Sequence, residues 1–156
     1  MHTYVIALDQ GTTSSRAVLF DENAHIVAMK SYEFEQLYPQ PGWVEHDPTA
    51  ILNTQIDALR EVVRISGVPL ESIAAIGITN QRETTLLWDR KTGRPLYNAI
   101  VWQCRRTAPI VARLCEEGLE EHIRTTTGLV PDAYFSGSKL SWLLDTLDLH
   151  ERAEKG

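Results

Sequence analysis

Residues 5–20 read Val-Ile-Ala-Leu-Asp-Gln-Gly-Thr-Thr-Ser-Ser-Arg-Ala-Val-Leu-Phe, and this stretch decides the fold. Two continuous apolar runs, 5–8 and 17–20, flank a polar segment that contains one glycine. Short apolar runs bounded by turn residues are typical of buried strands. A third run begins at His25, after the turn-forming residues 21–24. The sequence therefore predicts an antiparallel meander of three strands.

The next segment predicts a helix followed by another buried strand. Asp47 is a good N-cap, Pro48 suits the first helical position, and apolar residues then recur at helical spacing until Gly67. Residues 73–78 are again almost entirely apolar. A strand, a helix and a buried strand form a crossover unit, which implies parallel pairing and an α/β fold.

The remainder of the chain carries weaker signals. We expect a strand over 84–88, a helix over 110–115, and another over 140–147 that is capped by Ser136 or Ser138. Residues after Leu147 have a helix-forming composition. They form either a solvated tail or part of a longer protein that continues beyond Gly156.

Composition narrows the possible functions. The 156 residues carry 15 basic and 21 acidic side chains, for a net charge of -6, and 43% are hydrophobic. One domain with a real core is expected, and a nucleic-acid partner is not, because the only adjacent arginines are Arg105 and Arg106. The apolar run near the N-terminus is too short for a signal peptide or a membrane span, so we expect a cytoplasmic protein.

The segment from Asp9 to Arg16 is the first candidate site. Gly11 permits a tight turn whose backbone N–H groups, with the hydroxyls of Thr12, Thr13 and Ser14, could surround phosphate oxygens. Asp9 at the end of the strand could hold Mg²⁺ through water. The alternative is an ordinary polar hairpin turn, since the segment lacks the Walker pattern.

Further candidates follow the later apolar segments. Arg82 and Glu83, directly after the strand at 73–78, could clamp a ligand that carries hydroxyl groups, or form a solvated charge pair. Trp102 could back the carbon side of a polar ligand or be a core residue. Tyr134 could offer its hydroxyl from a loop, which alone is a weak signal. The five histidines are too scattered to predict a metal site.

These motifs together carry a family likeness. The chain resembles the N-terminal part of the glycerol kinases, which belong to the sugar-kinase group with the actin-like, ribonuclease-H-like ATPase fold. The matching stretches are Leu-Asp-Gln-Gly-Thr-Thr-Ser-Ser-Arg (8–16), Pro-Gly-Trp-Val-Glu-His-Asp-Pro (41–48), Ile-Gly-Ile-Thr-Asn-Gln-Arg-Glu-Thr-Thr (76–85), Asn-Ala-Ile-Val-Trp-Gln-Cys-Arg-Arg-Thr (98–107) and Tyr-Phe-Ser-Gly-Ser-Lys (134–139). One departure is Ala133, which stands where the family pattern would have proline.

The resemblance implies roles for the candidate residues. Glycerol is expected to bind Arg82, Glu83 and Tyr134 through its hydroxyls and to lie against Trp102. The phosphates of ATP or ADP are expected at Thr12, Thr13, Ser14 and Arg16, with Mg²⁺ near Asp9. The implied fold is a ribonuclease-H-like domain: a mixed sheet that begins with the meander and has helices on both faces.

The resemblance also implies what the chain lacks. We expect residues 1–156 to be the glycerol-side, phosphate-binding first domain of a two-domain kinase, a homo-oligomer when whole, that makes sn-glycerol 3-phosphate from glycerol and ATP. The catalytic aspartate and the adenine-binding domain would follow later, so this chain alone should be inactive. The alternatives are a kinase for another polyol or ketose, and a non-catalytic ligand-binding module of the same fold.

Overall fold

A computed structural model describes residues 2–155, which form two compact units. The first, here called the sheet unit, consists of residues 2–36 and 47–81. The second, here called the helical unit, consists of residues 37–46 and 82–155. Each unit is described by itself. No helix within residues 2–155 is long and apolar enough to cross a membrane.

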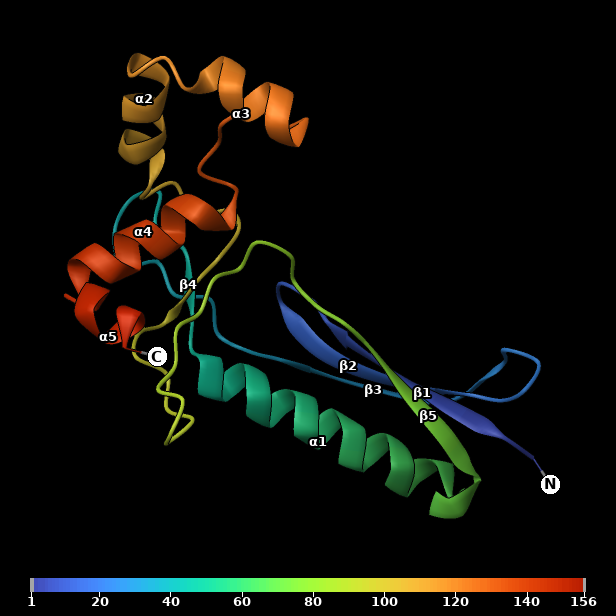
Figure 1. The fold of residues 1–156 in the computed structure, drawn as a ribbon. Coiled ribbons are helices and arrows are strands. Elements are labelled where there is room, and N and C mark those ends of the chain that lie inside the picture. The colour runs from blue at the N-terminus through green and yellow to red at the C-terminus, as the bar shows by residue number, and fades with distance from the viewer. Residues whose placement is uncertain (1, 156) are drawn as a thin grey trace. The chain divides into compact units, whose positions relative to one another are not determined.

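The sheet unit contains four strands in the order β3-β2-β1-β5 (Figure 1). The strands are β1 (Tyr4–Gln10), β2 (Ser14–Phe20), β3 (Ile26–Glu33) and β5 (Ile73–Thr79). β1 and β2 pair antiparallel, as do β2 and β3, which confirms the predicted meander. β5 pairs parallel with β1 and confirms the predicted crossover.

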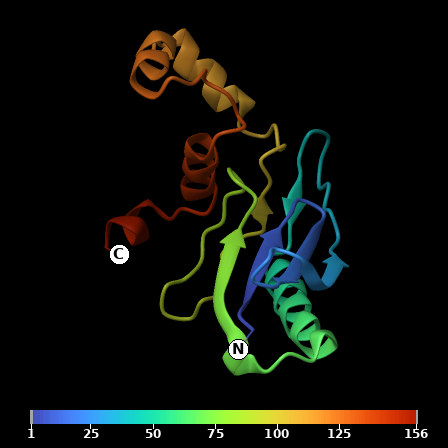
Figure 2. The same cartoon turned by 90° about the vertical axis from the view of Figure 1, so that its right-hand side faces the viewer.

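Helix α1 (Pro48–Ser66) makes the crossover and lies along one face of this sheet (Figures 1 and 2). Asp47 accepts a hydrogen bond from the N–H of Thr49, and Gly67 ends the helix at a φ of 66°. Both boundaries are as predicted. Gly67 suits the C-terminal one, because glycine adopts this left-handed conformation without steric cost. The core beneath the helix contains alternate strand residues, and its buried members are Ile6, Leu8, Ala17, Leu19, Ala58 and Val62.

The opposite face of the sheet differs from the expectation of helices on both faces. Val5, Val27 and Met29 are 42%, 42% and 53% exposed there. The described residues of the sheet unit supply a helix of more than one turn for only one face, since η1 (Leu70–Ser72) has three residues. The α/β class and the mixed sheet that begins with a meander are as predicted.

The helical unit is built on a two-stranded antiparallel sheet and four helices. Its elements are β4 (Glu45–His46), β6 (Ala99–Ile100), α2 (Ala108–Glu116), α3 (Glu120–Thr127), α4 (Ser136–Thr146) and α5 (His150–Glu154). The helices predicted over 110–115 and 140–147 are present, each beginning earlier than predicted. α3 was not predicted, because its sequence is polar and lacks an apolar stripe.

Two local predictions in this unit are wrong. Residues 84–88 form no strand, and only isolated bridges join Thr85 to Ile100 and Trp88 to Pro95. Hydrogen bonds flank the second bridge, from the Leu96 N–H to the Leu87 carbonyl and from the Asp89 N–H to the Arg94 carbonyl, but a longer ladder does not form among the described residues. Neither Ser136 nor Ser138 caps α4 as its N-cap residue, since Phe135 occupies that position without a side-chain hydrogen bond. The N–H of Ser136 instead donates to Glu83 Oε2 at 2.7 Å.

A buried ion pair lies at the centre of the helical unit. Arg106 Nη2 donates to Glu45 Oε1 at 2.6 Å, and both side chains are at most 3% exposed. Tyr97 and Asn98 donate to the same carboxylate at 3.0 and 2.8 Å. The guanidinium lies 3.8 Å from the ring centre of Trp43, close enough for a cation–π interaction. Burial opposes ionisation of Glu45, but these hydrogen bonds hold its pKa below the ordinary value.

We predict that Glu45→Gln lowers the free energy of unfolding by about 3–5 kcal/mol, because it leaves the Arg106 charge buried without its anion. Urea denaturation at pH 7 measures this. Glu151→Gln is the matched control, since Glu151 forms a solvent-exposed pair with Lys155 and should leave the midpoint unchanged. Equal stability of Glu45→Gln and the parent protein would contradict the assignment.

The neighbouring His46 predicts a pH dependence of stability. Its side chain is fully buried, and burial lowers its pKa from 6.5 to about 4. The unfolded chain therefore binds more protons between these pH values, and the stability present above pH 6.5 is lost as the pH falls toward 4. The loss should approach about 3 kcal/mol. Urea midpoints of the parent and His46→Gln at several pH values measure it. A parent slope no steeper than the variant's would refute the prediction.

Candidate functional site

The turn between β1 and β2 brings the predicted phosphate-side residues together. Gly11, Thr12 and Thr13 connect the strands, and the N–H of Gly11 donates to the carbonyl of Ser14 at 3.0 Å. Asp9 and Arg16 are cross-strand partners, with 3.7 Å between their charged groups. Both side chains are almost half exposed, at 46% and 44%, so this ion pair leaves both groups accessible to a ligand.

Ser15 anchors this turn from below. Its side chain is fully buried and hydrogen-bonds Gln10 Oε1 at 2.9 Å and the Thr54 hydroxyl of α1 at 2.8 Å. Because strand residues alternate between faces, Ser14 and Arg16 lie on the face away from α1. A Cβ at Gly11 would approach the Ser14 carbonyl oxygen to 3.2 Å, so this position favours glycine.

Mg²⁺ fits the chemistry of this turn. Among residues 2–155, no group of three or more His, Cys, Asp or Glu side chains could hold a metal alone. Mg²⁺ commonly binds through one or two carboxylates, several waters and the phosphates of its substrate. The single, partly exposed carboxylate of Asp9 matches that mode of binding.

Three of the four predicted glycerol-side residues form a connected group in the helical unit. The rings of Trp102 and Tyr134 meet edge to face with 5.9 Å between their centres. Glu83 joins this group through Ser136, two residues after Tyr134. Arg82 is exposed and lies next to Glu83 in the chain.

Glu83 is held in an uncommon conformation. Its φ is 64°, in the left-handed region that residues other than glycine rarely occupy. The N–H and the hydroxyl of Ser136 both donate to Glu83 Oε2 at 2.7 Å. Within residues 2–155, Oε1 takes no hydrogen-bond partner, so one carboxylate oxygen is fixed and the other can accept from a ligand.

The loop before α4 sets the direction of Tyr134. Arg105 Nη1 contacts Asp132 Oδ1 at 2.7 Å, and the same oxygen accepts from the N–H of Tyr134 at 2.7 Å. The Tyr134 N–H, followed by the Arg105 hydrogen bond, keeps the pKa of Asp132 below its ordinary value. Ala133, which replaces the expected proline, is fully buried. The Tyr134 side chain stays partly exposed.

Two residues of this group carried no functional prediction from the sequence. Ser136 was interpreted only as a possible helix cap, and Lys139 only as part of a motif. Lys139 is fully buried and donates to the carbonyls of Ala133, Tyr134 and Phe135. One signal was available, because Lys139 precedes Leu143 by four residues and so shares the core-facing side of α4.

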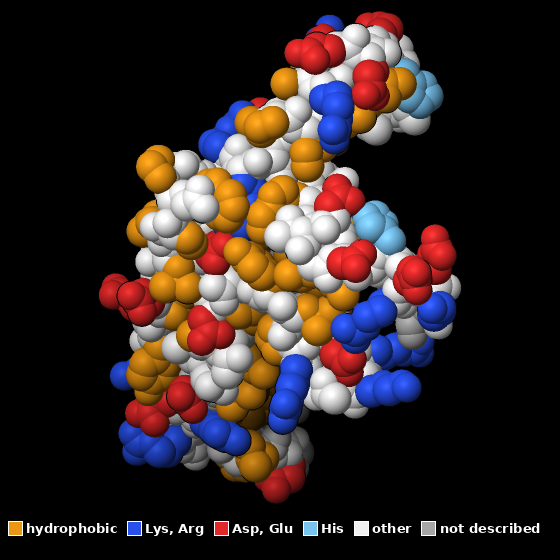
Figure 3. Space-filling model, turned by 90° about the vertical axis from the view of Figure 1, so that its left-hand side faces the viewer, with side chains coloured by type: hydrophobic (Ala, Val, Ile, Leu, Met, Phe, Trp, Pro, Cys, Tyr) orange, Lys and Arg blue, Asp and Glu red, His pale blue; other side chains and the backbone are white. Residues whose placement is uncertain are grey.

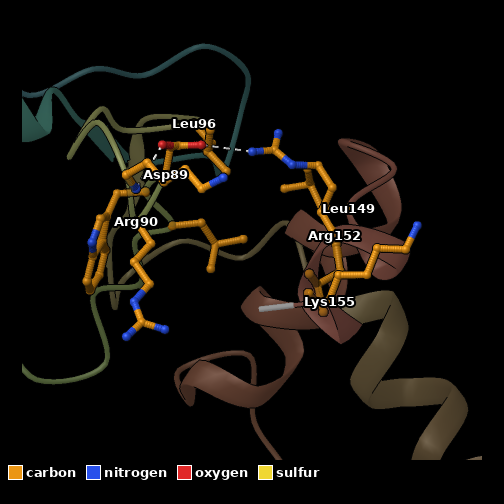
Figure 4. Close-up of a pocket in the computed structure, with 11 residues that line it drawn as sticks. Asp89, Arg90, Leu96, Leu149, Arg152 and Lys155 are labelled. Carbon is orange, nitrogen blue, oxygen red and sulfur yellow. Dashed lines mark hydrogen bonds and ion pairs between the residues drawn. The ribbon is translucent and has the colours of Figure 1, made fainter.

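The helical unit also contains a cavity of about 420 Å³ (Figure 4). Leucines at 87, 96, 144 and 149 form part of its wall, and Arg152 reaches Asp89 at 3.0 Å across it. Its described lining includes none of the predicted site residues. In Figure 3 acidic and basic side chains are interspersed, with hydrophobic ones exposed between them.

Comparison with known proteins identifies the family. The family's sequence model for the N-terminal domain, described as "FGGY family of carbohydrate kinases, N-terminal domain", matches residues 4–155. The chain belongs to the FGGY family of carbohydrate kinases. Among curated FGGY relatives, it is 59% identical over 154 residues to "Glycerol kinase 2" of Thermotoga maritima and 60% identical over 154 residues to "Glycerol kinase" of Symbiobacterium thermophilum.

Solved FGGY kinase structures share the fold. The chain aligns to a glycerol kinase of Plasmodium falciparum with ADP at a TM-score of 0.84 and 35% identity, covering 92% of this chain and 29% of that one. It aligns to a xylulose kinase of Rhodospirillum rubrum at 0.83 and 29%, covering 96% and 30%. The predicted actin-like fold is thereby confirmed. The two curated relatives are covered over 98% of this chain but only 31% of their own length.

Proposed function

We propose that this chain is the N-terminal, glycerol-binding domain of a kinase that transfers the γ-phosphoryl group of ATP to glycerol and releases sn-glycerol 3-phosphate and ADP. The observation that carries the proposal is the 59% identity to a glycerol kinase over 98% of the chain. The whole protein is expected to be cytoplasmic and homo-oligomeric, with no nucleic-acid partner.

The glycerol side of the proposal assigns complementary chemistry to four residues. Arg82 supplies hydrogen-bond donors, Glu83 supplies an acceptor, and the Tyr134 hydroxyl supplies either. Trp102 contributes an apolar surface for the carbon backbone. The edge-to-face contact of Trp102 with Tyr134 and the free Oε1 of Glu83 support this assignment. A small triol needs polar partners on one side and an apolar wall on the other.

The phosphate side of the proposal lies in the turn after β1. Thr12, Thr13 and Ser14 would donate to phosphate oxygens, and Arg16 would neutralise their charge. Asp9 would hold Mg²⁺ through water. Bound Mg²⁺ would neutralise the phosphate oxygens during transfer. The exposure of Asp9 and Arg16 supports these roles, because both groups can leave their mutual ion pair for a ligand.

One alternative within the family has its own support. Xylulose kinases align at 26–29% identity and TM-scores of 0.82–0.83, so the fold also suits a ketose. Glycerol is favoured because the solved glycerol kinase is 35% identical to this chain, above the xylulose kinases, and a curated glycerol kinase is 59% identical. A non-catalytic binding module is the second alternative, and a reading frame that stops after residue 156 would favour it.

The substrate prediction concerns the complete protein that contains this chain. Purified protein should phosphorylate glycerol with ATP and Mg²⁺, and should turn over xylulose at a far lower kcat/KM. The 156-residue chain alone should show no glycerol-dependent ADP release, because the catalytic base is expected outside it. A coupled ADP assay measures both. Preference for a ketose, or normal turnover by the short chain, would contradict the proposal.

Two substitutions separate the two halves of the proposed site. In the complete protein, Glu83→Gln should raise the KM for glycerol about ten-fold or more, because it weakens a charge-assisted hydrogen bond. Arg16→Ala should instead raise the KM for ATP. Steady-state kinetics with each substrate varied in turn test this. Arg60→Ala, on the exposed side of α1, is the control for Arg16→Ala. Equal effects on both KM values would show that the halves are wrongly assigned.

A further inference from the structure

Lys139 is a fully buried cation in the first turns of α4. Three consecutive carbonyls converge on its ammonium group: Ala133 at 2.9 Å, Phe135 at 3.2 Å, and Tyr134 between them. An ammonium has three N–H donors and no acceptor, so these oxygens satisfy it completely. Burying a charge is costly compared with burying an apolar chain of similar volume. What the charge provides here is geometric, because it fixes three successive peptide groups.

The charged groups around Lys139 help to keep its ammonium group protonated at neutral pH. Burial lowers its pKa to about 8, while the nearby Glu83, Cys104 and Asp132 oppose that shift and Arg105 adds to it. The ammonium form is therefore the main form at pH 7. The buried ammonium binds the carbonyls of the loop 133–135. On the exposed side, Arg105 pairs with Asp132, which accepts from the N–H of Tyr134.

Ser136, in the first turn of α4, fixes the carboxylate of Glu83. Both its N–H and its hydroxyl donate to one oxygen of Glu83, and this stabilises a residue whose φ is 64°. The two donors use Oε2 only. The carboxylate therefore stays in one orientation with Oε1 open.

The start of α4 is itself anchored. The hydroxyl of Ser138 hydrogen-bonds that of the buried Thr107 at 2.8 Å. Three segments far apart in sequence thus meet at one helical turn: 82–84, 104–107 and 132–135. Trp102 is close in sequence to the second of these segments.

We propose that Lys139 and Ser136 are positioning residues, which hold the Tyr134 hydroxyl and the Glu83 carboxylate in place for one small polyol. This rests on the proposed function, since it takes Tyr134 and Glu83 as glycerol ligands. Neither positioning group reaches the ligand: the ammonium is consumed by carbonyls, and the Ser136 donors are consumed by Glu83. Their effect on glycerol passes through the residues they hold.

The test uses the complete protein with four single variants: Lys139→Met, Ser136→Ala, Ser136→Thr and the matched control Lys155→Met, at an exposed lysine. Lys139→Met and Ser136→Ala should raise the KM for glycerol about ten-fold or more and change the KM for ATP less than about two-fold. Ser136→Thr keeps the hydroxyl and should retain the parent KM. Lys139→Gln, which keeps two N–H donors, replaces Lys139→Met if that variant fails to fold.

Double variants distinguish positioning from a general structural role. Ser136→Ala should add little to the glycerol KM in a Glu83→Gln background, and Lys139→Met should add little in a Tyr134→Phe background. Fully multiplicative effects, or glycerol and ATP KM values that rise together, would overturn the inference. A parent protein that does not phosphorylate glycerol would overturn the proposed function, whereas an active parent with unaffected variants overturns positioning alone.

Discussion

The ion pair between Glu45 and Arg106 is the constraint on which the helical unit depends. A charge pair removed from water is stable only when its geometry is good and further contacts compensate for the lost hydration. Among the described residues, Arg106 Nη1 is buried without a hydrogen-bond partner. Here the carboxylate receives three donors, and the guanidinium lies against the rings of Trp43 and Trp142. These contacts join β4, the segment before β6, the segment after it and α4. Trp142 links this centre to α4, the helix that follows the Tyr134 loop.

The proposed phosphate-binding group and the proposed glycerol-binding group are built on different physical principles. In the sheet unit, the alternation of strand residues buries Ser15 and leaves Ser14 and Arg16 on the other face, so backbone pairing does most of the positioning. In the helical unit, no extended ladder is available, and buried polar contacts position the side chains instead. A hydrogen-bonded group of side chains in which Glu83 Oε1 stays free to accept suits the recognition of a small uncharged ligand.

The sequence predicted the sheet unit better than the helical unit, and the reason is locality. The meander, the crossover and both ends of α1 follow from neighbours in the chain: apolar runs, Asp47 with Pro48, and Gly67. The helical unit depends on partners 31 to 61 residues apart, as between Thr107 and Ser138 or between Glu45 and Arg106. No local pattern distinguishes such a buried ion pair from two surface charges. The incorrect strand at 84–88 has the same origin, because Leu87 packs against the core of this unit and the stretch forms no ladder.

The site shows the same limit in sharper form. Motifs identified the residue types at Glu83, Trp102 and Tyr134, but not the group that unites them. That group depends on Lys139, whose charge would ordinarily place it in solvent. A lysine at a core-facing helix position is a contradiction between local pattern and residue chemistry, and such contradictions concentrate at functional sites. Here three carbonyls resolve it. Those carbonyls belong to the loop that carries Tyr134. The contacts that compensate for burying the charge therefore also fix the loop that we propose binds the ligand.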